Sequence, residues 1–241
     1  GQSIPYAARA HGIPVEVWIP QGNSVEKNAA MRAWGAELVV HGADFEEARA
    51  ACAASAGERG LHLIPPWHPD LVLGVATYAA ELIRAAAPDV IYVPVGMGSG
   101  ACGCIAARDA LGAPTEIVGV VADAAPAYAL SFEAGEIVTT PSAPTFADGV
   151  ACRSPWAEPL AMLRAGCARM VRVTDDEIAE AMRILYIDTH NVAEGAGAAA
   201  FAALMQERGR LAGRRAAAIL CGGNVDAAVF AEVLRGGTPR Q

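Results

Sequence analysis

Hydrophobic positions recur with two different periods along this chain of 241 residues. Short β-branched runs indicate buried strands, and longer alanine-rich stretches with helical spacing lie between them. The first quarter of the chain predicts the order helix, strand, helix, strand, helix, strand. The predicted helices cover 3–11, 25–34 and 44–55, and the predicted strands cover 15–19, 36–41 and 61–64. This order favours a parallel sheet in a small lobe, residues 1–64.

The run Pro65-Pro66-Trp67-His68-Pro69 interrupts both periods and predicts a lobe boundary. Strands and helices then alternate again in a large lobe, residues 65–241. Its predicted helices lie at 70–86, 101–111, 126–135, 156–165, 175–189, 194–207 and 226–234, and its predicted strands at 89–95, 116–121, 169–173 and 216–221. The fold class is therefore α/β, with two lobes of parallel sheet flanked by helices.

The strand predicted at 89–95 ends in the glycine loop, which we define as Gly96-Met97-Gly98-Ser99-Gly100. A helix is predicted directly after it. Glycines let backbone N–H groups approach an anion closely, and a helix N-terminus adds a positive dipole end. The arrangement therefore suits a phosphate group.

Three interpretations of the glycine loop remain open at this level. The spacing Gly98-x-Gly100-x-x-Gly103 matches the dinucleotide fingerprint, and Asp123 follows about 20 residues on, where a ribose ligand is expected. The loop also suits the phosphate of a smaller cofactor, or it is a packing turn without a ligand. No Gly-Lys-Ser/Thr follows, which excludes a P-loop.

Composition limits the partners and the compartment. Net charge is −8, which argues against nucleic acid and against an anionic membrane surface. No apolar run reaches the ~18 residues of a membrane span. The six cysteines include no Cys-x-x-Cys pair and the five histidines include no His-x-x-x-His pair, so we predict no metal site and reduced cysteines in a cytoplasmic protein. Lys27 is the only lysine.

Six segments, taken in order, carry a resemblance to one family: 1–8, 27–37, 93–100, 145–149, 194–198 and 220–224. Together they resemble the serine/threonine dehydratases (threonine ammonia-lyases), which are fold-type II pyridoxal-phosphate enzymes. The resemblance implies a tryptophan synthase β-like fold and pyridoxal 5'-phosphate as the cofactor. It also implies the conversion of L-threonine or L-serine to a 2-keto acid and ammonia, with an amino-acid substrate as small-molecule partner and a homodimer as the assembly.

The resemblance also implies which residues bind the cofactor: Gly96, Met97, Gly98, Ser99, Gly100, Glu194 and Cys221. Backbone N–H groups of the glycine loop would hold the phosphate, although Met97 and Ser99 replace two family glycines. Cys221 would face the pyridine nitrogen, and Glu194 would support the cofactor face. The strand end Val120–Asp123 lacks the glutamate of the family's cation site, so no metal is expected.

The resemblance assigns no catalytic amine. The family's Schiff-base lysine lies upstream of the segment that Gly1 matches, and Lys27 matches a different, surface lysine. The small lobe would thus be incomplete at its N-terminus, and we expect this chain alone to be inactive. Two alternatives stay open: a lysine-less relative that binds pyridoxal phosphate or an amino acid without turnover, and an NAD(P)-binding oxidoreductase that uses the fingerprint. Racemase activity is a near neighbour of the dehydratase reaction.

Overall fold

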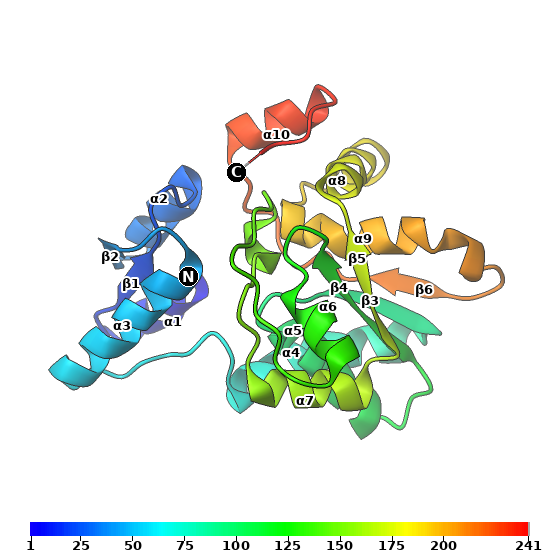
Figure 1. Cartoon of the computed structure of the whole chain (residues 1–241), viewed down its shortest axis with the longest axis horizontal. Helices are drawn as coiled ribbons and strands as arrows, with labels where there is room; N and C mark the ends of the chain where they lie inside the picture. The colour runs from blue at the N-terminus through cyan, green and yellow to red at the C-terminus, as the bar shows by residue number, and fades with distance from the viewer. Residues whose placement is uncertain (241) are drawn as a thin grey trace. The chain divides into compact units, whose positions relative to one another are not determined.

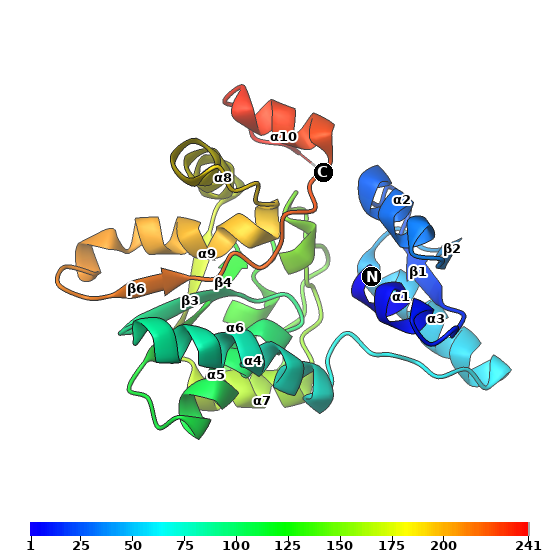
Figure 2. The ribbon, with the colours of Figure 1, turned by 180° about the vertical axis from the view of Figure 1, so that it is seen from behind.

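Two separate parallel sheets organise the computed structural model, which describes residues 1–240 (Figures 1 and 2). The first unit comprises Gly1–Pro65 together with Asn224–Ala228, and the second comprises Pro66–Gly223 together with the residues from Val229 onward. The short segment Asn224–Ala228 therefore departs from the predicted large lobe, residues 65–241. Hydrogen bonds from the start of α2 to Asp226 hold it in the first unit, and the sequence near Asp226 does not indicate them.

The first unit is built on strands β1 (Glu16–Ile19) and β2 (Glu37–Val40), which pair in parallel with Glu16 opposite Glu37. Its helices are α1 (Ser3–Arg9), α2 (Val25–Ala33) and α3 (Phe45–Arg59). Ile19, Met31 and Ala36 form its small buried core. The predicted order of helices and strands is confirmed up to α3.

The strand predicted at 61–64 is wrong. These residues join no ladder, and Leu61, Leu63 and Ile64 are 40–45% exposed. Their alternation resembles a strand, but period alone does not show whether a neighbouring edge is available for pairing. The helix predicted to end at Ser55 also continues to Arg59 and ends at Gly60, where φ is +64°. Gly57 therefore lies inside the helix and does not end it.

The second unit contains a four-stranded parallel sheet in the order β5-β4-β3-β6. The strands are β3 (Val90–Pro94), β4 (Glu116–Ala122), β5 (Arg169–Val173) and β6 (Ala216–Ala218). All five residues of β3 are buried, as its continuous apolar run predicts for an inner parallel strand. The strand predicted at 216–221 is shorter, because ladder pairing with β3 ends at Ala218.

Helices cover both faces of this sheet. Helices α4 (Pro69–Ala86), α5 (Ser99–Ala110) and α7 (Ala157–Gly166) lie on one side, and α9 (Gly195–Gln206) lies on the other, with α8 (Asp175–Thr189) packed outside it (Figures 1 and 2). The remaining helices are α6 (Ala127–Ala134) and α10 (Ala227–Leu234), with short 3-10 turns at Asp148–Val150 and Arg208–Arg210.

Local signals set several helix ends. A capping box starts α8, since Thr174 and Glu177 exchange side-chain and backbone hydrogen bonds. No helix within residues 1–240 combines the length and apolarity that crossing a bilayer requires.

A polar network ties the central strand to the end of α9. Tyr92 Oη donates to Glu207 Oε2 at 2.7 Å, and the Arg169 guanidinium pairs with the same carboxylate. Burial acts to raise the pKa of Glu207, but hydrogen bonds from Arg169 and Tyr92 outweigh it and lower the pKa to about 2. The ionised carboxylate is therefore part of the folded state.

We predict that this carboxylate makes the second unit acid-sensitive. Its folded pKa lies below the ordinary 4.5, so its contribution is complete above pH 4.5 and is lost as pH falls toward 2. Glu207→Gln should lower the free energy of unfolding at pH 7 by about 1–3 kcal/mol and flatten its pH dependence below 4.5. Urea unfolding at pH 7 and pH 3 measures both effects. Glu133→Gln, which removes a surface ion pair with Arg172, is the control and should cost under about 0.5 kcal/mol; equal losses would contradict the prediction.

Candidate cofactor site

The glycine loop joins the end of β3 to the start of α5. Gly98 is the N-cap of α5 and has φ +92°, a conformation that favours glycine. Within residues 1–240 no acceptor takes the backbone N–H groups of Gly96 to Gly100, whereas the N–H of Cys102 donates to Gly98 O at 2.9 Å. Five successive donors at a helix N-terminus are thus left available for an anion.

Met97 and Ser99 fit this loop without strain. Among the described non-glycine residues only Ala87 and His190 have positive φ, so neither replacement needs the conformation that glycine alone adopts easily. The Met97 side chain packs against the buried core, with its sulfur 3.7 Å from Cys152 Sγ. The two departures from the family glycines therefore leave the N–H donors in place.

Close backbone contacts surround the loop. A Cβ atom at Gly96 would lie 2.3 Å from the carbonyl oxygen of Gly149, and one at Gly149 would lie 2.8 Å from Ala196 Cβ. The glycine loop, residues 145–149 and the start of α9 therefore stack almost backbone to backbone. Asp175 anchors the middle segment, since it accepts hydrogen bonds from Thr145 Oγ1 at 2.5 Å and from Phe146 N at 3.4 Å.

The structure also brings Glu194 to the chain that leaves β6. Glu194 is the N-cap of α9, and its N–H donates to Gly222 O at 3.1 Å. A Cβ atom at Gly222 would lie 2.3 Å from Glu194 Oε1, and one at Gly197 would lie 2.2 Å from Gly222 O. Cys221 directly precedes this contact and is exposed.

The predicted residues share one edge of the sheet. β3 and β6 are parallel neighbours, so the glycine loop after β3 and Cys221 after β6 both leave the carboxyl ends of the strands. Ligands of open α/β sheets bind outside this edge. The predicted residues Gly96 to Gly100, Glu194 and Cys221 thus surround a candidate ligand position, although their roles toward a cofactor stay predictions.

Tyr78 is a neighbour that the sequence did not indicate. It lies in α4, with Oη 3.8 Å from Cys104 Sγ. Burial raises its pKa well above the ordinary 10, and the nearby thiols of Cys104 and Cys221 add to the effect. Tyr78 is therefore a neutral hydroxyl close to the thiol expected at the pyridine nitrogen.

Two other features lie apart from this edge. Gly103, the third glycine of the fingerprint, permits close packing on α4, since a Cβ there would lie 2.5 Å from Val75 Cγ1. Lys27, the one lysine, lies in α2 of the first unit. Within residues 1–240 no group of three or more His, Cys, Asp or Glu side chains could hold a metal ion.

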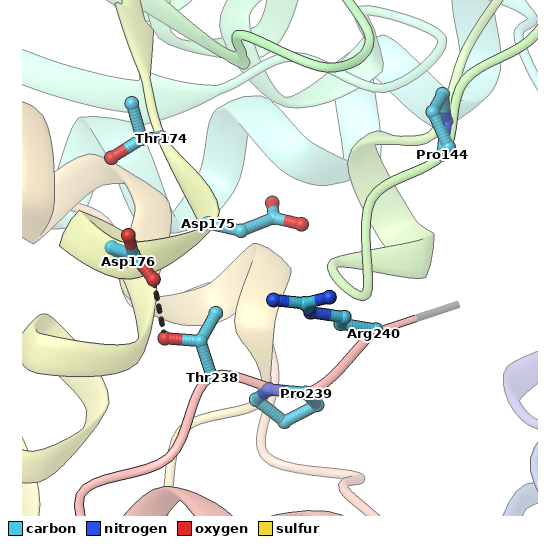
Figure 3. A pocket seen from close by; sticks show the side chains of 7 residues that line it. All are labelled: Pro144, Thr174, Asp175, Asp176, Thr238, Pro239 and Arg240. Atoms are coloured by element: carbon cyan, nitrogen blue, oxygen red, sulfur yellow. Dashed lines mark hydrogen bonds between the residues drawn. The ribbon is translucent and has the colours of Figure 1, made fainter.

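A cavity of about 610 Å³ lies at the start of α8, and none of the predicted site residues lines it (Figure 3). Its lining residues are Pro144, Thr174, Asp175, Asp176, Thr238, Pro239 and Arg240. Thr238 Oγ1 donates to Asp176 at 2.6 Å across it. The carboxylates of Asp175 and Asp176 outnumber the one guanidinium of Arg240 in this lining, so the cavity is a poor match for a phosphate.

Comparison with known proteins finds similar sequences and similar structures. A family model described as pyridoxal-phosphate dependent enzyme matches residues 1–222. The chain is 34% identical over 239 residues to L-threonine ammonia-lyase of Geobacter sulfurreducens, covering 98% of this chain and 59% of that protein. It is 31% identical over 237 residues to L-threo-3-hydroxyaspartate ammonia-lyase of a Pseudomonas species, covering 98% and 74%. The structure of the processed form of threonine deaminase isoform 2 from Solanum lycopersicum superposes with a TM-score of 0.89 at 28% identity, covering 98% of this chain and 70% of that one.

We predict that Gly96 and Gly100 differ in their tolerance of a side chain. Gly96→Ala places a methyl group against a backbone oxygen that cannot rotate away, whereas Gly100→Ala makes only ordinary contacts at 3.6 Å and beyond. Gly96→Ala should lower the free energy of unfolding by about 1–3 kcal/mol and weaken phosphate-ester binding. Gly100→Ala is the matched control, since it adds the same methyl group four residues away. Urea unfolding compares them, and equal stabilities would show that the Gly96–Gly149 contact does not constrain the loop.

Proposed function

The chain belongs to the pyridoxal-phosphate-dependent enzyme family, and on that premise we propose that it serves a lyase which converts L-threonine or L-serine to a 2-keto acid and ammonia. The observation that carries the proposal is the row of five available N–H donors, Gly96 to Gly100, at the carboxyl edge of the sheet. The similarity to L-threonine ammonia-lyase supports the reaction class. The chain spans 59% of that relative's length, so the activity of a whole protein is part of the proposal.

The residues present fit the phosphate end of the cofactor. Donors from the glycine loop and the dipole of α5 would hold a dianion, and the close contact at Gly96 leaves no room for a side chain. When bound, pyridoxal phosphate supplies an electron sink for the bond broken at the substrate's α-carbon. The protein's own contribution is to orient the reacting groups and to set the charges around them.

Cys221 would meet the pyridine nitrogen with a thiol, which is a weak hydrogen-bond donor. A weak donor leaves that nitrogen largely unprotonated, which suits rapid loss of water over exchange of the amino group. Glu194 is held at the same strand exit by its backbone hydrogen bond to Gly222 O. We assign it to the cofactor face, where its carboxylate would orient the ring.

No residue of this chain is assigned as the amine that carries the cofactor. Lys27 lies in α2 of the first unit, whereas the glycine loop, Glu194 and Cys221 all lie in the second unit. We therefore propose that this chain binds pyridoxal phosphate without turning over threonine by itself. A homodimer and a cytoplasmic location complete the proposal.

The related chemistry of 3-hydroxyaspartate is the second candidate. It rests on the 31% identity to L-threo-3-hydroxyaspartate ammonia-lyase, which covers 98% of this chain. Both substrates carry a hydroxyl on the β-carbon, so the same elimination serves either one. The two candidates differ in the substrate side chain that the site accepts. Assaying threonine, serine and 3-hydroxyaspartate side by side distinguishes them.

We predict that the chain binds pyridoxal 5'-phosphate and not NAD, as titrations followed by absorbance and tryptophan fluorescence will show. The protein encoded by the complete reading frame should form 2-ketobutyrate from L-threonine and pyruvate from L-serine, measured with the 241-residue chain alongside. NAD binding without pyridoxal phosphate binding would overturn the assignment in favour of an oxidoreductase. Pyridoxal phosphate binding by a complete protein that leaves threonine, serine and 3-hydroxyaspartate unchanged would favour a non-catalytic binding relative.

A further inference from the structure

Tyr128 connects the glycine loop to a helix that packs against it. The residue lies in the first turn of α6 and is 1% exposed. Its hydroxyl donates to the carbonyl oxygen of Met97 at 3.2 Å and accepts from the backbone N–H of Trp156, the N-cap of α7, at 3.3 Å. One buried hydroxyl thus joins two backbone groups that are far apart in the sequence.

The bond to Met97 fixes the orientation of one peptide group in the loop. In a trans peptide the carbonyl oxygen and the N–H of the next residue point in opposite directions. When Tyr128 holds Met97 O, the N–H of Gly98 faces away from Tyr128, where no acceptor within residues 1–240 takes it. A flip of this peptide would replace that donor with a carbonyl oxygen, which repels an anion.

The bond to Trp156 links the same hydroxyl to the start of α7, the helix against which the loop packs. A Cβ atom at Gly98 would lie 3.1 Å from Pro159 Cβ and 3.5 Å from Leu163 Cδ1, so the loop rests directly on α7. Through its two hydrogen bonds, Tyr128 joins Trp156, the N-cap of α7, to the glycine loop. Gly98, with φ +92°, is the residue whose backbone this arrangement must keep in place.

We propose that Tyr128 is a positioning residue for the cofactor's phosphate, because its hydroxyl holds the Met97–Gly98 peptide with the Gly98 N–H presented to the anion. The proposal rests on the proposed function of the glycine loop. Tyr128 itself does not contact the ligand. It acts through the peptide, so its removal should weaken recognition of the phosphate group more than recognition of the ring.

The test compares two aldehyde-free probes, pyridoxine 5'-phosphate and pyridoxine, which cannot form a covalent bond with an amine. Calorimetric titration gives the ratio of their dissociation constants for the wild-type chain and for Tyr128→Phe. The wild type should prefer the phosphate ester, and Tyr128→Phe should reduce that preference about three- to tenfold while changing pyridoxine binding less than about twofold.

Tyr186→Phe is the matched control. Tyr186 lies in α8, its ring packs edge-on against Phe230, and it is 38% exposed. The control should leave both dissociation constants unchanged. A Tyr128→Phe variant that weakens both probes equally has lost general packing, and that result overturns the positioning role.

The outcomes separate this inference from the proposed function. If the wild type binds pyridoxine 5'-phosphate no better than pyridoxine, the phosphate site and the role of Tyr128 both fail. If the wild type discriminates and Tyr128→Phe discriminates equally well, only the role of Tyr128 fails.

A second measurement decides the case in which Tyr128→Phe does not fold, as judged by circular dichroism. A crystal structure of the wild-type chain with pyridoxine 5'-phosphate should show Tyr128 Oη within hydrogen-bond distance of Met97 O and the Gly98 N–H directed at the phosphate. A Met97 carbonyl turned away from Tyr128 would overturn the inference.

Discussion

The close approach of backbones at the carboxyl edge of the second sheet is the constraint on which the candidate site depends. The carbonyl oxygen of Gly149 fills the position where a side chain of Gly96 would begin, and the carbonyl oxygen of Gly222 does the same at Gly197. Each contact joins segments that are distant in sequence. A side chain at either position would push the two backbones apart, and the glycine loop would no longer meet residues 145–149 and the start of α9.

The same packing explains the electrostatics of the loop. The five N–H groups of Gly96 to Gly100 have no acceptor in residues 1–240. A phosphate that accepts from them would form charge-assisted hydrogen bonds, so the ligand should stabilise the fold that binds it. This local positive end offers an anion a site although the whole chain carries a net charge of −8. The bond from Tyr128 to Met97 O matters because each peptide in such a loop can present either a donor or an acceptor.

The sequence predicted those features that depend on residues close together along the chain. The apolar run of β3, the capping box of Thr174 and the glycine loop were all visible in the sequence, and the structure contains each of them. The wrong strand at 61–64 and the early end of β6 have a common cause, since pairing depends on which edge lies nearby. The hydrophobic period also does not give the order of the strands in a sheet. Only the family resemblance therefore predicted that Cys221 and the glycine loop belong to one site. Tyr78 and Tyr128 carried no signal, because their partners are distant in sequence.

The segment after Cys221 makes hydrogen bonds to the start of α2, about 200 residues earlier in the sequence. Only residues 222–225 separate Cys221 from Asp226, whose carboxylate caps α2 by accepting from Ser24 Oγ at 2.5 Å and from the N–H groups of Val25 and Glu26 at 3.1 Å. Glu26 Oε1 in turn accepts from the N–H of Ala227 at 2.8 Å. Burial acts to raise the pKa of Asp226, but its bonds to Ser24 and the two N–H groups outweigh it and lower the pKa, so this reciprocal cap is strongest with an ionised carboxylate. The chain that leaves the candidate site is therefore fastened to the first unit within five residues of Cys221.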